Sequence, residues 1–186
     1  MDRDTALQQL SDDAEIRRVL YRYARGIDRR DPELVRSCYH ADAIDHHGTF
    51  DGTRDEYVMW VFQVLEAHTF TSHNLMNISI EVCGDLALVE TYAVATHGGE
   101  PATDRRKNFV AGFRYVDRFE RRDGGWRIAE RQVVNDWAEA WAPDRSRLGR
   151  FGVLSRSGPD DPLYALARTV PGAVEHSDAG PSGPVA

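Results

Sequence analysis

The chain has 186 residues, 41% of them hydrophobic, and a formal net charge of −7 at pH 7, which fits one globular domain and argues against nucleic acid as a partner. No apolar run approaches the roughly 18 residues that a membrane span needs, and the N-terminus lacks the apolar segment of a signal peptide. The two cysteines form no CxxC pair, so we expect a cytoplasmic, reduced protein without membrane contact.

A first helix is predicted from Asp12, an N-cap residue with Glu15 as its capping-box partner. Gly26 is expected to end the regular helix, which leaves Asp28 on the turn that follows. Tyr23 lies on the apolar side of this helix and can approach Asp28. The apolar stripe at helical spacing consists of Ile16, Val19, Leu20, Tyr23 and Ile27.

Two further helices and a short strand follow. Asp31-Pro32 predicts a second helix start, because proline suits the first turn. Residues 41–47 favour a short strand, and residues 48–52 favour a turn. Thr53 and Glu56 form a capping box that predicts a third helix.

From Thr71 onward the pattern favours strands. Gly84-Asp85 and the segment 123–125 are hairpin turn signals. Three helices followed by such a meander predict an α+β fold, in which a curved antiparallel or mixed sheet wraps on the N-terminal helices as a cone with an apolar interior. The predicted long strands are Thr71–Val82, Leu86–Thr96, Asn108–Arg121 and Trp126–Trp137.

The predicted domain organisation has three parts. Residues 1–142 form the single cone domain. Residues 143–170 are expected to hold a short helix and to cover the pocket mouth. Residues 171–186 are rich in Gly, Pro, Ser and Ala, and we expect a disordered tail there.

The Asp45-His46-His47 run invites a metal-site interpretation. Adjacent strand residues point to opposite faces of a sheet, so His46 and His47 cannot easily hold one ion. We therefore expect no metal. One of the three residues is expected at the rim of a pocket, where Asp45 or His47 could hydrogen-bond a substrate.

Asp28 and His73 have the clearest catalytic potential. Asp28 follows the first helix, and His73 opens the first long strand. If the fold joins them, Asp28 orients the imidazole and stabilises its protonated form, and His73 becomes a general base near neutral pH. Spacing alone leaves open a cap aspartate and a strand-edge histidine that never meet.

Two local phrases give the chain a family resemblance. The segments Tyr39–Gly52 (YHADAIDHHGTFDG) and Arg22–Asp28 (RYARGID) are similar to the polyketide-cyclase-like, or SnoaL-like, branch of the nuclear transport factor two-like superfamily. That branch includes scytalone dehydratase, hexachlorocyclohexane dehydrochlorinase and bile acid 7α-dehydratase. The resemblance covers about residues 10–140 and implies the cone-shaped α+β barrel of the superfamily.

The resemblance also implies site residues at matching positions. The family's lyases use an aspartate after the first helix and a histidine on the first long strand, and Asp28 and His73 hold these places. An arginine of the last strand lines the pocket in several members. Arg131 is its nearest match, and one bulge would exchange it with Arg114. The further candidates for assisting roles are Tyr23, His97 and Arg131.

Aromatic side chains, Trp60 among them, are expected to supply both core and cavity lining, which suggests a small hydrophobic, ring-containing substrate. No phosphate-binding loop or nucleophilic serine or cysteine stands out, so we expect no cofactor. The favoured function is a cofactor-independent lyase, a dehydratase or a related elimination enzyme. An isomerase or polyketide cyclase with the same residues stays open, and so does a noncatalytic small subunit or ligand-binding module.

The outer face of the predicted sheet carries apolar residues around Val110, Val116 and Val133. Patches of this kind rarely stay bare on a monomer. We therefore expect a homodimer or a homotrimer.

Overall fold

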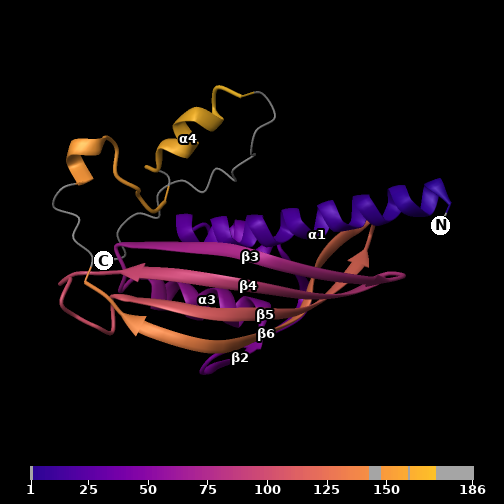
Figure 1. Cartoon of the computed structure of the whole chain (residues 1–186), viewed down its shortest axis with the longest axis horizontal. Coiled ribbons are helices and arrows are strands. Elements are labelled where there is room, and N and C mark those ends of the chain that lie inside the picture. The colour runs from indigo at the N-terminus through magenta and orange to yellow at the C-terminus, as the bar shows by residue number, and fades with distance from the viewer. Residues whose placement is uncertain (1, 143–147, 159, 171–186) are drawn as a thin grey trace, which may run out of the picture.

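The computed structural model describes residues 2–142, 148–158 and 160–170 (Figure 1). Two helices, two strands and a third helix make up the described part of residues 2–65, and four long strands follow. The elements are α1 (Arg3–Arg29), α2 (Pro32–Arg36), β1 (Tyr39–His47), β2 (Phe50–Thr53), α3 (Arg54–Leu65), β3 (Phe70–Cys83), β4 (Leu86–Gly98), β5 (Phe109–Arg122), β6 (Gly125–Ala140), η1 (Leu148–Phe151) and α4 (Pro162–Ala167).

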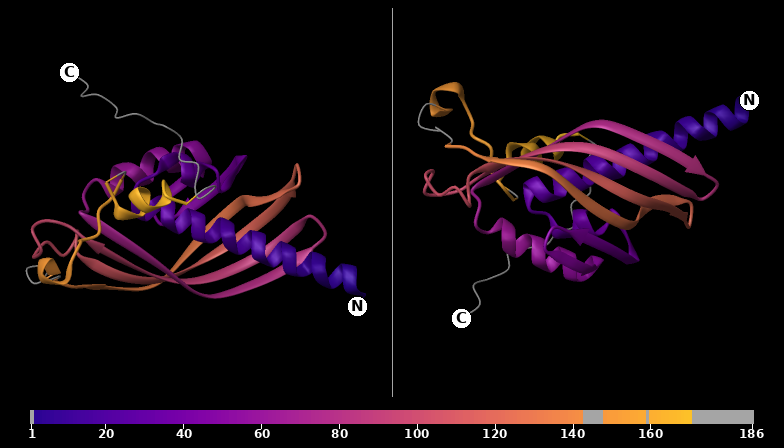
Figure 2. Two further views of the ribbon diagram at one scale, coloured as in Figure 1. Left: turned by 90° about the horizontal axis from the view of Figure 1, so that it is seen from above. Right: turned by 60° about the horizontal axis from the view of Figure 1, so that its bottom comes forward.

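All six strands form one mixed sheet in the order β2-β1-β6-β5-β4-β3. The β1–β6 pair is parallel, and every other pair is antiparallel. The long strands curve, and α1 lies along the hollow of the sheet beside β3 (Figure 2). The core fills the space between this hollow and helices α1 and α3. The predicted α+β cone is therefore confirmed.

Helix α1 is longer at its N-terminal end than the sequence pattern predicts. It begins after Asp2, whose carboxylate accepts from the N–H groups of Asp4 and Thr5. The predicted cap, Asp12, lies inside the helix and is buried. Its Oδ1 accepts from Trp126 Nε1 at 3.0 Å, so the carboxylate joins α1 to β6 rather than capping a helix.

Helix α1 also runs past Gly26, where we expected its end. A Cβ at Gly26 would lie 2.7 Å from Val35 Cγ2, so the missing side chain allows α2 to pack closely against α1. The helix ends at Arg29, and Arg30 takes the left-handed conformation with φ 55°. Asp28 therefore lies in the last helical turn and not beyond it.

The turn predicted at residues 48–52 contains most of a short strand, β2, which pairs with β1. The capping box of Thr53 and Glu56 and the helix start at Asp31-Pro32 are confirmed. Register shifts in the β5–β6 pair turn Val133 into the core, where it is 6% exposed. Val133 is thus not part of the outer face, as we had expected.

In the described part of the chain, no helix combines the length and the apolar character that crossing a bilayer requires.

Candidate active site

Asp28 and His73 meet where α1 packs against β3. His73 Nδ1 lies 2.7 Å from Asp28 Oδ1, and the His73 backbone N–H donates to Asp28 Oδ2 at 2.9 Å. Thr71 Oγ1 donates to Asp28 Oδ1, also at 2.9 Å. The side chains of His73 and Asp28 are only 9% and 15% exposed. Three hydrogen bonds from β3 thus hold the carboxylate, which in turn fixes the imidazole.

The charge on Asp28 determines which ring nitrogen of His73 is free to accept a proton. Burial raises the pKa of Asp28, but the hydrogen bond and charge of His73 outweigh burial and hold this pKa below its ordinary value. The ionised carboxylate accepts from Nδ1–H, so Nε2 carries the lone pair whenever the ring is neutral. Nε2 has no hydrogen-bond partner among the described residues. This nitrogen can take a proton from a bound molecule.

The imidazole of His73 faces an aromatic interior. Its ring centroid lies 5.6 Å from that of His97 and 6.5 Å from that of Phe113, and His97 stacks on Phe109 at 4.3 Å. Burial, followed by repulsion from charge on His73 and His68, lowers the pKa of His97 to about 3. The structure therefore places His97 beside the Asp28–His73 pair, on strand β4, as a neutral ring at pH 7.

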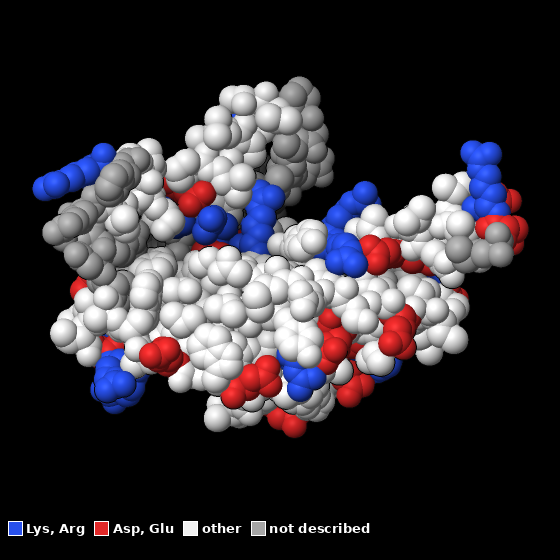
Figure 3. Space-filling view, in the orientation of Figure 1, with Lys and Arg blue, Asp and Glu red and all other residues white. Residues whose placement is uncertain are grey.

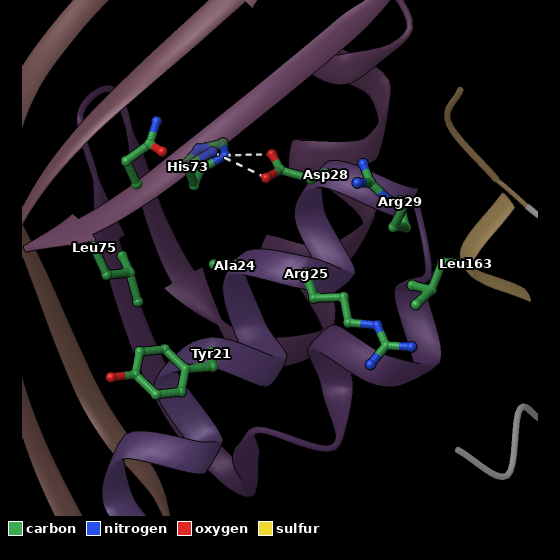
Figure 4. Close-up of a pocket in the computed structure, with 9 residues that line it drawn as sticks. Tyr21, Ala24, Arg25, Asp28, Arg29, His73, Leu75 and Leu163 are labelled. Atoms are coloured by element: carbon green, nitrogen blue, oxygen red, sulfur yellow. Dashed lines mark hydrogen bonds and ion pairs between the residues drawn. The ribbon is translucent and has the colours of Figure 1, made fainter. Parts of the chain in front are cut away.

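A pocket of about 470 Å³ reaches the pair from the outer side of α1 (Figure 4). The Nε and Nη2 atoms of Arg25 are buried without a hydrogen-bond partner among the described residues. The α1 side of the pair is therefore cationic, whereas its interior side is aromatic. The pocket is lined by Tyr21, Ala24, Arg25, Asp28, Arg29, His73, Asn74, Leu75 and Leu163.

The C-terminal segment packs on the end of α1 near this pocket. The Gly158 N–H donates to the Arg29 carbonyl at 2.7 Å, and Arg29 Nε lies 3.5 Å from Asp161 Oδ2. Leu163, from the predicted short helix around it, borders the pocket directly. Part of the segment expected over the pocket mouth, and all of the expected tail at 171–186, lie outside the described residues.

The structure does not bring Tyr23 and Arg131 to this pocket. Arg131 is fully buried, and its Nε and Nη2 donate to Asp117 at 2.7 and 2.6 Å. Its guanidinium lies between the rings of Tyr23 and Tyr115, at 4.2 and 3.9 Å from their centroids. The Tyr23 hydroxyl is hydrogen-bonded to that of Tyr57. Both side chains are thus buried in the core, outside the lining of this pocket, and the assisting roles expected for them stay predictions.

Arg114, the alternative to Arg131, lies on the opposite face of the sheet. It donates to Glu90 at 2.6 Å there. Arg131 therefore lies inside the cone, and Arg114 lies outside it.

Trp60 of α3 is half-buried and stacks on Phe50, with centroids 5.2 Å apart. It also lies 5.8 Å from the ring of His47. Trp60 does not line the pocket beside Asp28, so the structure brings it to His47 rather than to His73.

The two neighbouring histidines of β1 point to opposite faces, as strand alternation predicts. His46 lies near Asp51 and Glu130, whereas His47 stacks on Tyr57 in the interior. Within residues 2–142, 148–158 and 160–170, no group of three or more His, Cys, Asp or Glu side chains is arranged to hold a metal ion.

Arg25 and Arg29 were missed as pocket residues. A signal for Arg25 was present, because Tyr21, Arg25 and Asp28 recur on one stripe of the helix at three- and four-residue spacing. Arg29 has no comparable signal, since its position depends on how α4 packs on the helix end.

Comparison with known proteins places these features in a family. The model of the SnoaL-like domain matches residues 8–132. An uncharacterized protein of Mycobacterium tuberculosis is 32% identical over 129 residues, which span 68% of this chain and 86% of the relative.

Solved structures share the fold at lower sequence identity. A candidate scytalone dehydratase from Novosphingobium aromaticivorans aligns with a TM-score of 0.64 at 21% identity, over 82% of this chain and 95% of that one. A hexachlorocyclohexane dehydrochlorinase from Novosphingobium barchaimii aligns with a TM-score of 0.65 at 19% identity, over 75% and 96% of the two chains. At these identities the likeness shows a common fold.

Proposed function

This chain belongs to the SnoaL-like domain family, and from that premise we propose that it is a cofactor-independent lyase acting on a small hydrophobic, ring-containing molecule. His73 removes a proton next to an activating group, and Asp28 orients His73. The observation that carries the proposal is the short contact between Asp28 and His73 Nδ1, which leaves Nε2 of a ring near Phe113 without a partner among the described residues.

Proton removal by His73 places a positive charge on its ring beside Asp28. When Nε2 takes a proton the imidazole becomes positive, and a carboxylate 2.7 Å from the other nitrogen stabilises that charge. A positioned acid or base of this kind typically accelerates proton transfer by about 10²–10⁴-fold. The low exposure of both side chains strengthens the interaction, because fewer water molecules screen it.

Elimination is favoured over the other outcomes of proton removal. Two of the structural relatives are named for eliminations, a dehydratase and a dehydrochlorinase. The same base could serve an isomerase or a polyketide cyclase, in which the atoms of the substrate are kept. The mass of the product distinguishes these, because an elimination product is lighter than its substrate by the leaving group.

A noncatalytic subunit or ligand-binding module is the alternative of another class. It gives no reason for a buried pair in which the second ring nitrogen has no hydrogen-bond partner among the described residues. It also predicts that replacing His73 leaves the protein's role intact, whereas a lyase loses its activity.

A direct test uses a probe that has an acidic C–H bond but no leaving group. Propiophenone incubated in D₂O exchanges its α-protons when a base removes them, and NMR measures the rate. We expect catalysed exchange by the wild-type protein, and a loss of about 10²-fold or more in His73→Gln. The matched control is His46→Gln, which lies on the outer side of β1 and is expected to exchange at the wild-type rate.

Self-association also stays a prediction. Much of the sheet face turned to the viewer in Figure 3 carries no charged side chain. Large apolar side chains are exposed on the strands, among them Leu88, Tyr92 and Trp137. A homodimer or homotrimer would cover them, and light scattering of the purified protein would give the molar mass that decides.

A further inference from the structure

A second carboxylate–imidazole pair lies in the interior, on strand β1. Asp45 and His47 are two residues apart, so both side chains point into the core. His47 Nδ1 lies 3.4 Å from Asp45 Oδ1. Both atoms are buried, and neither has a hydrogen-bond partner of good geometry among the described residues. A buried donor and a buried acceptor this close are the natural partners of one another.

The surroundings of Asp45 leave its Oδ1 to His47. Asp45 is fully buried, and Tyr39 donates to its Oδ2 at 2.7 Å. The guanidinium of Arg131 donates instead to Asp117, through two hydrogen bonds. Among the described residues, the His47 ring is therefore the group placed to donate to Oδ1 of Asp45.

His47 shares an aromatic interior with His73. The ring centroid of His47 lies 6.5 Å from that of Tyr115, which lies 5.1 Å from Phe113, which in turn lies 6.5 Å from His73. Charge on either histidine also lowers the pKa of His97, so both act on the same part of the molecule. The side chain of His47 is 24% exposed, so the ring is not closed off from a bound molecule.

We infer that His47, held by Asp45, is the general acid of the reaction in which His73 is the base. The inference rests on the proposed function, because it assigns the second proton transfer of the same elimination. It also narrows the substrate class to molecules with a hydroxyl group β to a carbonyl.

The proposed elimination moves one proton onto His73 and one proton from His47 to the leaving oxygen. His73 Nε2 takes the proton from the carbon next to the carbonyl, and the C–H electron pair becomes the new C=C bond. The bond from the β-carbon to oxygen breaks, and the oxygen takes the proton from His47 Nε2 and leaves as water. His47 ends neutral with Nδ1–H toward Asp45, and His73 ends as an imidazolium on Asp28. Exchange of protons with water restores both rings.

Leaving groups differ in whether they need a proton from an acid. Hydroxide is a strong base and leaves well only when it is protonated, whereas chloride leaves unprotonated. An enzyme with a proton donor opposite its base is therefore suited to eliminating water.

The test compares two probes that give the same product, phenyl vinyl ketone. β-Hydroxypropiophenone loses water, and β-chloropropiophenone loses HCl. In His47→Gln we expect the ratio of kcat/KM for the hydroxy probe to that for the chloro probe to fall about 10²-fold. His46→Gln, the neighbour on the opposite face of β1, is the matched control and is expected to keep the wild-type ratio.

A second measurement needs no substrate and no variant. Nitrogen NMR of histidine-labelled wild-type protein is expected to show protons on both Nδ1 and Nε2 of His47. The inference is overturned if Nε2 of His47 carries no proton, or if His47→Gln slows both probes by the same factor. The failure of the proposed function looks different, because His73→Gln would then exchange the α-protons of propiophenone at the wild-type rate.

Discussion

Two of the buried carboxylate–nitrogen pairs among the described residues differ in the atoms that they leave without a hydrogen-bond partner. In the pair of Arg131 and Asp117, both side chains are 0% exposed, and Nε and Nη2 of the guanidinium each donate to one oxygen of the carboxylate. In the pair of Asp28 and His73, one ring nitrogen stays without a partner among the described residues, beside a pocket. A buried ion pair is therefore not by itself a candidate active site. The Asp28–His73 pair is a candidate because its partner-free ring nitrogen belongs to a side chain that lines a pocket.

The largest expected effect comes from breaking the fully buried ion pair of Arg131 and Asp117. Asp117→Ala leaves the Arg131 guanidinium buried without its counter-charge, so the free energy of unfolding should fall by about 3–5 kcal/mol. Urea denaturation followed by tryptophan fluorescence measures this loss.

The matched control for that variant is Glu90→Gln on the outer face. It removes an ion pair with Arg114 of similar length, 2.6 Å, but both partners are partly exposed to water. We expect a loss of at most about 1 kcal/mol. Equal losses in Asp117→Ala and Glu90→Gln would contradict the structural role given to Arg131.

A smaller effect concerns His97, the neutral ring beside the free nitrogen of His73. The unfolded chain takes up a proton on this histidine near pH 6.5, but the folded protein does so only near pH 3. The unfolded state therefore binds more protons between these values, and stability falls as the pH falls. The expected loss from His97 between pH 7 and pH 5 is about 2 kcal/mol.

His97→Asn removes the titrating group while keeping a polar side chain. Its free energy of unfolding should depend less on pH than that of the wild type over the same range. Urea midpoints at pH 7 and pH 5 for both proteins measure the difference. An equal pH dependence of stability in both proteins would mean that His97 is protonated in the folded state. Water would then reach the interior beside His73.

The sequence predicted the fold well because the signals for it are local. Hairpin turns at Gly84-Asp85 and at 123–125, and the capping box at Thr53, each depend on residues close together in the chain. The errors in α1 have local causes too. Asp12 looks like a cap, and only Arg121 of β5 and Trp126 of β6 show why a carboxylate is needed there. Gly26 looks like a helix end, and only Val35 of α2 explains its missing side chain.

The site was predicted less completely, since its parts come from distant segments. The meeting of Asp28 and His73 was expected from a family resemblance and not from spacing. The face on which Val133 lies depends on register shifts that no local pattern marks. Asp45 and His47 were expected at a pocket rim, and their contact has a local signal, because residues two apart on a strand share a face.

The most direct measurement of the central claim is the tautomer of His73 in the free protein. Nitrogen NMR of histidine-labelled protein, at a pH where this ring is neutral, reports which nitrogen carries the proton. We predict Nδ1–H toward Asp28 and a bare Nε2, with the proton shared more evenly between the nitrogens in Asp28→Asn. A wild-type ring protonated on Nε2 would have no lone pair to offer a substrate, and it would contradict the assignment of His73 as the base.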